Sequence, residues 1–274
     1  MSEKVIKSYK GFDKDMQCRG FQYEVGKEYE MDGEIKCCNR GFHACKSPME
    51  VWDYYDMLSS RYAEVEQSGK IDKEGNSTKV CSSRIKIKAE LKLADIINIG
   101  VEWLKDITSP SKVKTDGELN DNGDRKKQIG SSGDYAQIGS SGDYAKIGSS
   151  GDSAKIGSSG DYAKIGSSGD YAKIGSSGYY AQIGSSGDSA QIGSSGDYAK
   201  IDSTGEDSVI MCAGGNSKAK AKIGSWITLS EWEWSDEKKR DVPVCVKTEY
   251  VDGENIKSDT WYQLKNGKFV EVTE

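Results

Sequence analysis

The sequence is short of prolines, histidines and long apolar segments, and each shortage narrows what the protein can be. It has three prolines and one histidine, His43, so any chemistry that depends on histidine has a single candidate. No run of about 18 apolar residues is present, so no membrane-spanning helix and no membrane partner are expected. The first ten residues, MSEKVIKSYK, contain no apolar signal core, and we therefore expect no secretion by that route.

The chain is also low in hydrophobic residues and close to neutral in charge. Hydrophobic residues make up 35% of the 274 positions, below the roughly 45–50% of an average globular chain. The 38 basic and 44 acidic side chains leave a net charge of −6, which disfavours a nucleic-acid binder that relies on positive charge. Seven cysteines, of which Cys37 and Cys38 are adjacent, fit a reduced cytoplasmic protein better than a disulfide framework.

A nine-residue repeat fills the centre of the sequence and determines the expected fold class. Eight units similar to GDYAKIGSS run from Gly133 to Thr204, with a degenerate unit before them and two decayed units after them. A period of nine is too short for a helical-pair repeat and is typical of a β-solenoid. Tyr-Ala-Lys-Ile is predicted to be the strand, with Ala and Ile facing inward, and Ser-Ser-Gly-Asp is predicted to be the turn.

The residue at the tyrosine position indicates how many units make one coil. With two units per coil, four tyrosines fall in one uninterrupted column, whereas three units per coil scatter the serines over two faces. We therefore predict a two-sided coil of about 18 residues, with a thin Ala/Ile core and rungs about 4.8 Å apart. The column, a candidate binding ladder, consists of Tyr144, Tyr162, Tyr180 and Tyr198.

This ladder has two interpretations, a solvated face with stacked rings or a regular binding surface. Residues 123–204 hold nine acids and eight bases, so they lack the acidic field of a DNA mimic. Calcium-binding β-rolls also have a period of nine, but they follow GGxGxDxUx, whereas this repeat reads GSSGDYAKI. Neither DNA mimicry nor calcium binding is therefore expected.

Two further modules flank the repeat, which gives a mainly β chain. Residues 1–107 are predicted to form an α/β domain, with a helix after the Ser47-Pro48 capping signal and another over 93–107. Residues 108–122 are polar and are predicted to be a linker to the solenoid at 123–222. Residues 223–274 are predicted to be an all-β cap whose tryptophans cover the last coil.

Three cysteines and the single histidine are candidate metal ligands. They offer the thiolate and imidazole groups that structural zinc prefers, usually four in tetrahedral geometry. The usual C-x2-C knuckle is absent, and the alternative is that the cysteines are small buried hydrophobes in a reduced protein. The candidate zinc ligands are Cys18, Cys38, His43 and Cys45.

Three motifs near the N-terminus resemble an uncharacterised domain family of phage and prophage proteins. They are KGFDKD at residues 10–15, CRGFQY at 18–23 and GFHAC at 41–45. Some members of that family carry a central nine-residue repeat, and members look similar around Gly224-Ser225-Trp226. The resemblance implies a viral or prophage origin and a bacterial cytoplasm as the place of action, and it supplies no biochemical function.

A second resemblance, to ADP-ribosyltransferase-like domains, concerns residues 9–68. Tyr9-Lys10-Gly11, Gly41-Phe42-His43 and the segment 61–67 follow the order of that family loosely. Its chemistry would require a carboxylate to orient the ribose, which Glu64 or Glu66 could supply. No complete triad is visible in the sequence.

The sequence therefore favours a non-enzymatic binding or decoy protein that acts on a host component through its repeat surface. Extended repeat surfaces suit binding, no catalytic constellation is evident, and the resemblance points to a viral origin. The partner is expected to be a host protein or a small ligand. The alternatives are an ADP-ribosyltransferase-like head on a solenoid spacer and a self-assembling structural repeat.

Overall fold

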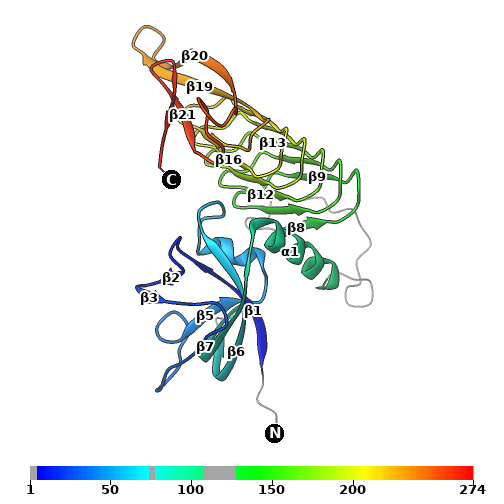
Figure 1. Cartoon of the computed structure of the whole chain (residues 1–274), viewed down its shortest axis with the longest axis vertical. Coiled ribbons are helices and arrows are strands. Elements are labelled where there is room, and N and C mark those ends of the chain that lie inside the picture. The colour runs from blue at the N-terminus through cyan, green and yellow to red at the C-terminus, as the bar shows by residue number, and fades with distance from the viewer. Residues whose placement is uncertain (1–4, 74–77, 108–127, 274) are drawn as a thin grey trace. The chain divides into compact units, whose positions relative to one another are not determined.

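The structure is a computed structural model that describes residues 5–73, 78–107 and 128–273 (Figure 1). The chain divides into two compact units, residues 1–103 and residues 104–274, and each is described by itself. The predicted linker at 108–122 lies outside the described residues. Within the described ranges, no helix has the length and apolar character needed to cross a membrane.

The N-terminal unit is an antiparallel sheet that closes on itself. Its strand order is β4-β7-β5-β1-β6, and β7 also pairs with β6, while β2 and β3 form a separate ribbon. Closure gathers Phe12, Phe42, Val65, Ile85 and Ile87 in one core. The strands are β1 (Ile6–Phe12), β2 (Gln17–Cys18), β3 (Phe21–Gln22), β4 (Glu28–Glu30), β5 (Phe42–Cys45), β6 (Arg61–Lys73) and β7 (Lys79–Leu91).

Two helices accompany this sheet, so the domain predicted as α/β is mostly strand. The 3-10 helix η1 (Met49–Asp53) replaces the longer helix predicted after Ser47, and no side chain caps it. Glu50 lies three residues after Ser47 and so completes a capping-box pattern in the sequence, but its carboxylate accepts hydrogen bonds from the Thr78 backbone N–H and hydroxyl (3.1 and 2.6 Å). The second predicted helix is confirmed as α1 (Leu93–Ile107). Its buried positions include Ile96, Ile97 and Val101.

Residues 128–229 form a β-solenoid of about six coils, which confirms the predicted two-sided architecture with two repeats per coil. Strands β8 to β16 each pair in parallel with the strand 18 residues further on, so one coil contains two repeats. Even-numbered strands from β8 to β18 lie in one sheet, and odd-numbered strands from β9 to β19 lie in the other (Figure 1). The strands are β8 (Gln128–Ser131), β9 (Gln137–Ser140), β10 (Lys146–Ser149), β11 (Lys155–Ser158), β12 (Lys164–Ser167), β13 (Lys173–Ser176), β14 (Gln182–Ser185), β15 (Gln191–Ser194), β16 (Lys200–Ser203), β17 (Val209–Cys212) and β18 (Lys218–Lys220).

The strand within each repeat begins two residues later than predicted. It reads Lys-Ile-Gly-Ser or Gln-Ile-Gly-Ser in most coils, rather than Tyr-Ala-Lys-Ile. The tyrosine position cannot join a strand because its backbone is left-handed, with φ between 55° and 59° in the eight clean units. Ala and Ile do face the core, and the first Ser of each pair joins them there. Gly-Asp-Tyr therefore forms the turn.

Buried serine hydroxyls run along the core of the solenoid. Six of them have no hydrogen-bond partner in the described part of the chain. An unpartnered buried polar group costs about 1–3 kcal/mol, so the coils depend on isoleucine packing and on hydrogen bonds between rungs. The six are Ser149, Ser158, Ser167, Ser176, Ser185 and Ser194.

The C-terminal strands continue the solenoid and cover its last coil. Strand β19 (Trp226–Ser235) forms the sixth rung of the odd-numbered sheet and pairs with β20 (Arg240–Tyr250). Strand β21 (Tyr262–Lys265) pairs with β18 and with β22 (Lys268–Glu271). The Asn266-Gly267 pair makes the β21–β22 turn, with φ of 51° and 67°. A left-handed Asn-Gly pair matches the twist of a two-residue hairpin.

Three of the four tryptophans of this cap do not cover the core, contrary to the sequence-based expectation, whereas Trp261 is buried. Trp226, Trp232 and Trp234 are all exposed. Trp226 lies at an outward position of β19, opposite the exposed Val209, and the Trp232 indole N–H donates to the Ala213 carbonyl (3.0 Å). The residues that close the end of the core are Val251, Ile256, Tyr262 and Leu264.

Candidate functional site

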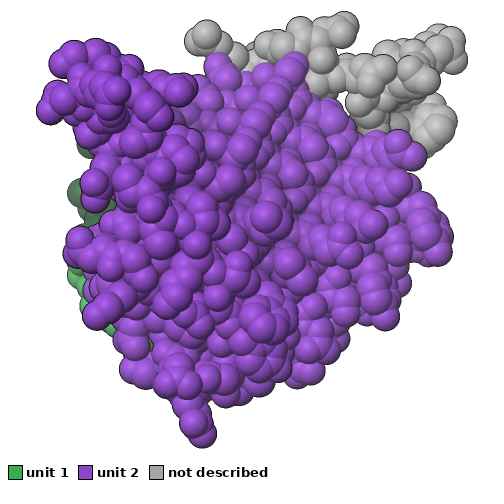
Figure 2. Space-filling view, turned by 90° about the horizontal axis from the view of Figure 1, so that it is seen from above, with its two compact units in different colours: residues 1–103 green, residues 104–274 purple. Residues whose placement is uncertain are grey.

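The four predicted ladder tyrosines form a continuous stack on the turns of the solenoid. The solenoid belongs to the unit of residues 104–274, which is purple in Figure 2. Successive ring centroids lie 5.0, 5.3 and 4.9 Å apart, with interplanar angles of 5°, 9° and 20°. The column thus lies along an edge of the coil, and the prediction that placed these tyrosines on a β-face is wrong. Because each ring covers the face of the next, the stack presents ring edges to solvent. Its members are Tyr144, Tyr162, Tyr180 and Tyr198, each 37–46% exposed.

Each of these tyrosines occupies a backbone position to which it is poorly suited. A left-handed conformation costs an ordinary residue roughly 1–2 kcal/mol, and Asn, Asp and Gly tolerate it best. The two decayed units place Asp207 and Asn216 at this position, with φ of 53° and 55°. In the continuous column, ring stacking offsets about 0.5–1.5 kcal/mol of this backbone cost per stacked pair. On the opposite edge, Tyr135 and Tyr171 alternate with serines and are 76% and 62% exposed. Local stability therefore does not account for the tyrosines.

An aspartate column runs next to each tyrosine column and connects the rungs. The Asp143 carboxylate accepts the backbone N–H of Asp161 (3.1 Å), and Asp161 accepts that of Tyr179 (2.8 Å). On the other edge, Asp152 accepts the N–H of Asp170 in the same way (2.9 Å). Each bond spans 18 residues, so it links equivalent turns of neighbouring coils. The edges are consequently acidic and well fixed, whereas the lysines lie on the strands.

Tyr179 takes the aspartate position in one repeat and widens the aromatic surface. Its ring centroid lies 4.3 Å from that of Tyr180 at 89°, and 5.2 Å from that of Tyr198. A hydrogen bond with Tyr180 raises the pKa of Tyr179 to about 12. Tyr179 was not among the predicted site residues, although the change from Gly-Asp-Tyr to Gly-Tyr-Tyr was a visible signal in the sequence.

The four predicted metal ligands do not come together, but a different Cys-His-Cys group does. Cys37, His43 and Cys81 place one ligand atom each within 4.8 Å of one another, an arrangement that could hold a metal ion. His43 on β5 lies directly opposite Cys81 on β7. The loop before β5 brings in Cys37, whose backbone N–H donates to the Asp72 carboxylate (2.8 Å). Cys37, which was not among the predicted ligands, is thus a member of the group.

The other three predicted ligands, all cysteines, make contacts outside the Cys-His-Cys group. The Cys18 thiol lies 2.9 Å from the Tyr55 hydroxyl. The Cys38 sulfur accepts a hydrogen bond from the Lys79 ammonium (3.1 Å). Cys45 is buried in the sheet, and burial raises the pKa of its thiol to about 12. Of the predicted set, only His43 belongs to the Cys-His-Cys group.

Burial controls the protonation of this group. It raises the pKa of the Cys81 thiol to about 12, raises the pKa of Cys37, and lowers the pKa of His43. At neutral pH the imidazole is therefore neutral and the two thiols are protonated. The His43 Nε2 atom accepts the Cys38 backbone N–H (3.0 Å). A metal ion would have to displace the thiol protons and compete for this lone pair, so its affinity would rise with pH.

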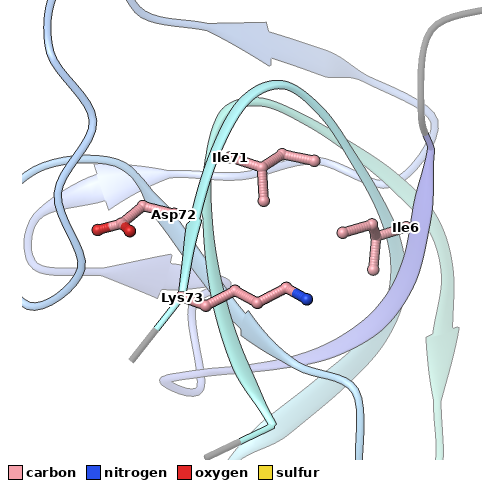
Figure 3. Close-up of a pocket in the computed structure, with 4 residues that line it drawn as sticks. All are labelled: Ile6, Ile71, Asp72 and Lys73. Atoms are coloured by element: carbon pink, nitrogen blue, oxygen red, sulfur yellow. The ribbon is translucent and has the colours of Figure 1, made fainter. Parts of the chain in front are cut away.

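The glutamates considered for ribosyl chemistry are both engaged by lysines. Lys7 lies 2.9 Å from the Glu64 carboxylate, and Lys88 lies 3.0 Å from that of Glu66. A hollow of about 390 Å³ in the N-terminal unit contains neither glutamate. In Figure 3, the Asp72 side chain points away from the other three lining side chains. The lining residues are Ile6, Ile71, Asp72 and Lys73.

Comparison with known proteins finds one family model that matches the N-terminal part of the chain. Residues 6–99 match the family model described as Domain of unknown function (DUF7666). The match covers about a third of the sequence and contains all three N-terminal motifs, so this part of the chain fits an uncharacterised family. No curated protein and no solved structure matches the chain. The similarity expected around Gly224-Ser225-Trp226 lies outside the matched range.

Proposed function

We propose that this protein is a non-enzymatic binding protein that engages a host component through the stacked tyrosine column. The observation that carries the proposal is the choice of tyrosine at an exposed, left-handed position. Asp207 and Asn216 fill the same position in the decayed units, where the backbone has the same conformation. A surface that keeps large aromatic rings at some cost to the backbone is suited to recognition, because tyrosine supplies contact area with little side-chain entropy to lose.

The chemistry of the edge favours a basic partner. The ring faces in the column are covered by their neighbours, so a partner meets ring edges together with the carboxylates of Asp143, Asp161 and Asp197. Lysine and arginine side chains on a protein would complement the carboxylates through ion pairs, and their apolar stems would pack against the ring edges. The proposed partner is therefore a host protein with a positively charged surface.

We further propose a phage or prophage origin, with the bacterial cytoplasm as the place of action. The resemblance of the KGFDKD, CRGFQY and GFHAC motifs supports the origin. The seven cysteines are all free, which suits a reducing compartment.

The proposal is tested by replacing Tyr144, Tyr162, Tyr180 and Tyr198 together with serine. Serine already occupies the equivalent positions 153 and 189 with the same backbone conformation, so the solenoid should remain folded. Affinity capture from a bacterial lysate, followed by binding measurements with the purified partner, should show at least a tenfold loss of affinity in this variant. Loss of several aromatic hot-spot contacts is sufficient for such a change.

The matched control replaces Tyr135 and Tyr171 on the opposite edge with serine. This variant should bind the same partner as the unmodified protein. Equal binding by all three proteins would contradict a role for the stacked column. Circular dichroism on each variant separates a loss of binding from a loss of fold.

We also propose that Cys37, His43 and Cys81 form a zinc site. Their grouping within 4.8 Å supports this assignment, which replaces the ligand set expected from sequence spacing. Two thiolates, one imidazole and a water molecule make a four-coordinate site of the kind zinc accepts. Both thiols lose a proton on binding, so the apparent affinity should increase as the pH rises from 6 to 8.

Metal analysis of protein prepared without chelator should find close to one zinc per chain. The Cys37→Ser, Cys81→Ser double variant should lose this zinc, and chelation should lower the melting temperature of the unmodified protein but not that of this variant. The Cys18→Ser, Cys45→Ser double variant is the control, because neither thiol belongs to the group. Retention of zinc by the first variant and loss by the second would assign the site to the other cysteines.

A further inference from the structure

The outer edge of strand β20 is an unpaired sheet edge. In the described part of the chain, β20 is the terminal strand of its seven-stranded sheet and pairs with β19 on one side (Figure 1). Its register with β19 is uninterrupted from Tyr250 to Cys245, and a shift follows beyond that point. Pro243 lies past this shift and has no N–H to donate. The pairing-competent edge therefore runs from Val244 to Tyr250.

Alternation along β20 determines which backbone groups point outward. Val251 donates its N–H to the Ser225 carbonyl (2.9 Å) and accepts the N–H of Gly224 (3.1 Å), so both its polar groups point toward the β19 side. In an antiparallel pair, every second residue repeats this orientation. Residues 245, 247 and 249 therefore bond to β19. The N–H and C=O groups of residues 246, 248 and 250 point to the open edge.

Apolar side chains are exposed along the same edge. Val246 is 64% exposed and Tyr250 is 43% exposed. Tyr250 continues a cross-strand row that includes Val209 and Trp226, both also exposed, and its ring lies 5.0 Å from the Trp226 ring. On the opposite face of the strand, Lys247 and Glu249 form an ion pair (2.7 Å). The edge thus combines free backbone groups, uncovered apolar area and one charge of each sign.

We infer that two copies of this chain pair antiparallel through their β20 edges, with Thr248 of each copy at the two-fold axis. In this register Thr248 exchanges both backbone hydrogen bonds with Thr248 of the second copy. Lys247 lies opposite Glu249 of the second copy, and Val246 lies opposite its Tyr250. The apolar row through Trp226 and Tyr250 then continues onto the second copy, and one sheet runs through the dimer.

The charges select this register over its neighbours. The outward groups of residues 246, 248 and 250 must face each other, which leaves few two-fold registers. Centring the pair on Lys247 sets lysine opposite lysine, and centring it on Glu249 sets glutamate opposite glutamate, both unfavourable. Centring it on Val246 sets Lys247 opposite Cys245 and draws Pro243 into the ladder. Only the register centred on Thr248 places opposite charges together on both sides of the axis.

Sedimentation of the full chain over a range of micromolar concentrations tests the inference. The unmodified protein should be a dimer. Lys247→Glu should raise the dissociation constant about tenfold or more, because two opposite-charge pairs become two like-charge pairs. The Lys247→Glu, Glu249→Lys double variant should restore dimerisation, since the exchanged charges are again complementary. Lys265→Glu, the same charge change outside β20, should have no effect.

A second variant separates pairing from folding. Val246→Pro removes an N–H that points to the open edge and leaves the bonds to β19 in place, so it should give a folded monomer. If the unmodified protein is a monomer at every concentration, the inference is overturned. This holds even if the edge then proves to bind a peptide of another protein. A dimer that resists both Val246→Pro and Lys247→Glu would overturn it as well.

Discussion

Deleting residues 151–168 or residues 151–159 should leave a folded, shorter solenoid, whereas deleting residues 151–154 should disrupt it. The 18-residue deletion removes β11 and β12 together. Strand β13 then follows β10 in the chain and takes the place of β11, so it pairs with β9 through the same residue types. The later strands keep their sheets, and the loss is limited to one nearest-neighbour interface between coils.

The nine-residue deletion moves every later strand to the opposite sheet, but these strands move together. Strand β12 takes the place of β11 beside β9 through the same residue types, and β18 still pairs with β21 as β19 does with β20. The four-residue deletion instead removes the turn that carries the chain from β10 to β11 in the other sheet, together with the buried Ala154, which should cost several kcal/mol through lost burial. Thermal melts of the three variants measure the difference. Equal melting temperatures for the four-residue and 18-residue deletions would contradict the stacking of whole repeats.

The coil length could be read from the sequence because stacked rungs place identical positions in contact. The uninterrupted column of Tyr144, Tyr162, Tyr180 and Tyr198 made sense only with 18 residues per coil, and the parallel register confirms this. The strand limits could not be read in the same way. Tyrosine favours strands in general, but here inter-rung bonds hold it in a left-handed turn, for example from the Tyr162 N–H to the Tyr179 carbonyl (2.8 Å).

The metal-ligand group was only partly visible in the sequence. Local spacing pointed to Cys38 and Cys45, which are close to His43 along the chain. In the structure, cross-strand pairing of β5 with β7 brings in Cys81, which is 38 residues away from His43. The direction of each thiol depends on this long-range register, and a single sequence does not contain it. The same limit applies to Glu50, whose carboxylate bonds to Thr78 and not to the helix start that its spacing indicated.

Two glycines of one repeat should respond in opposite ways to the addition of a methyl group. At Gly169, a Cβ atom would lie 2.1 Å from the Gly151 carbonyl oxygen and 2.5 Å from its carbon. These are backbone atoms of the neighbouring coil, held by the ladder on both sides of the turn, so they cannot move aside. At Gly175, a Cβ atom would have nothing within 4 Å.

Gly169→Ala should therefore lower the free energy of unfolding of the solenoid by about 3 kcal/mol or more. Gly175→Ala should leave it unchanged or raise it by up to about 1 kcal/mol, because alanine restricts the unfolded chain more than glycine does. The two variants add the same atoms six positions apart, so the comparison isolates the contact between coils. Urea unfolding followed by circular dichroism gives both values. Equal urea midpoints for the two variants would contradict the close approach of successive turns at Gly169. The methyl group would then fit only if the turns were further apart than the spacing of the β-ladder allows.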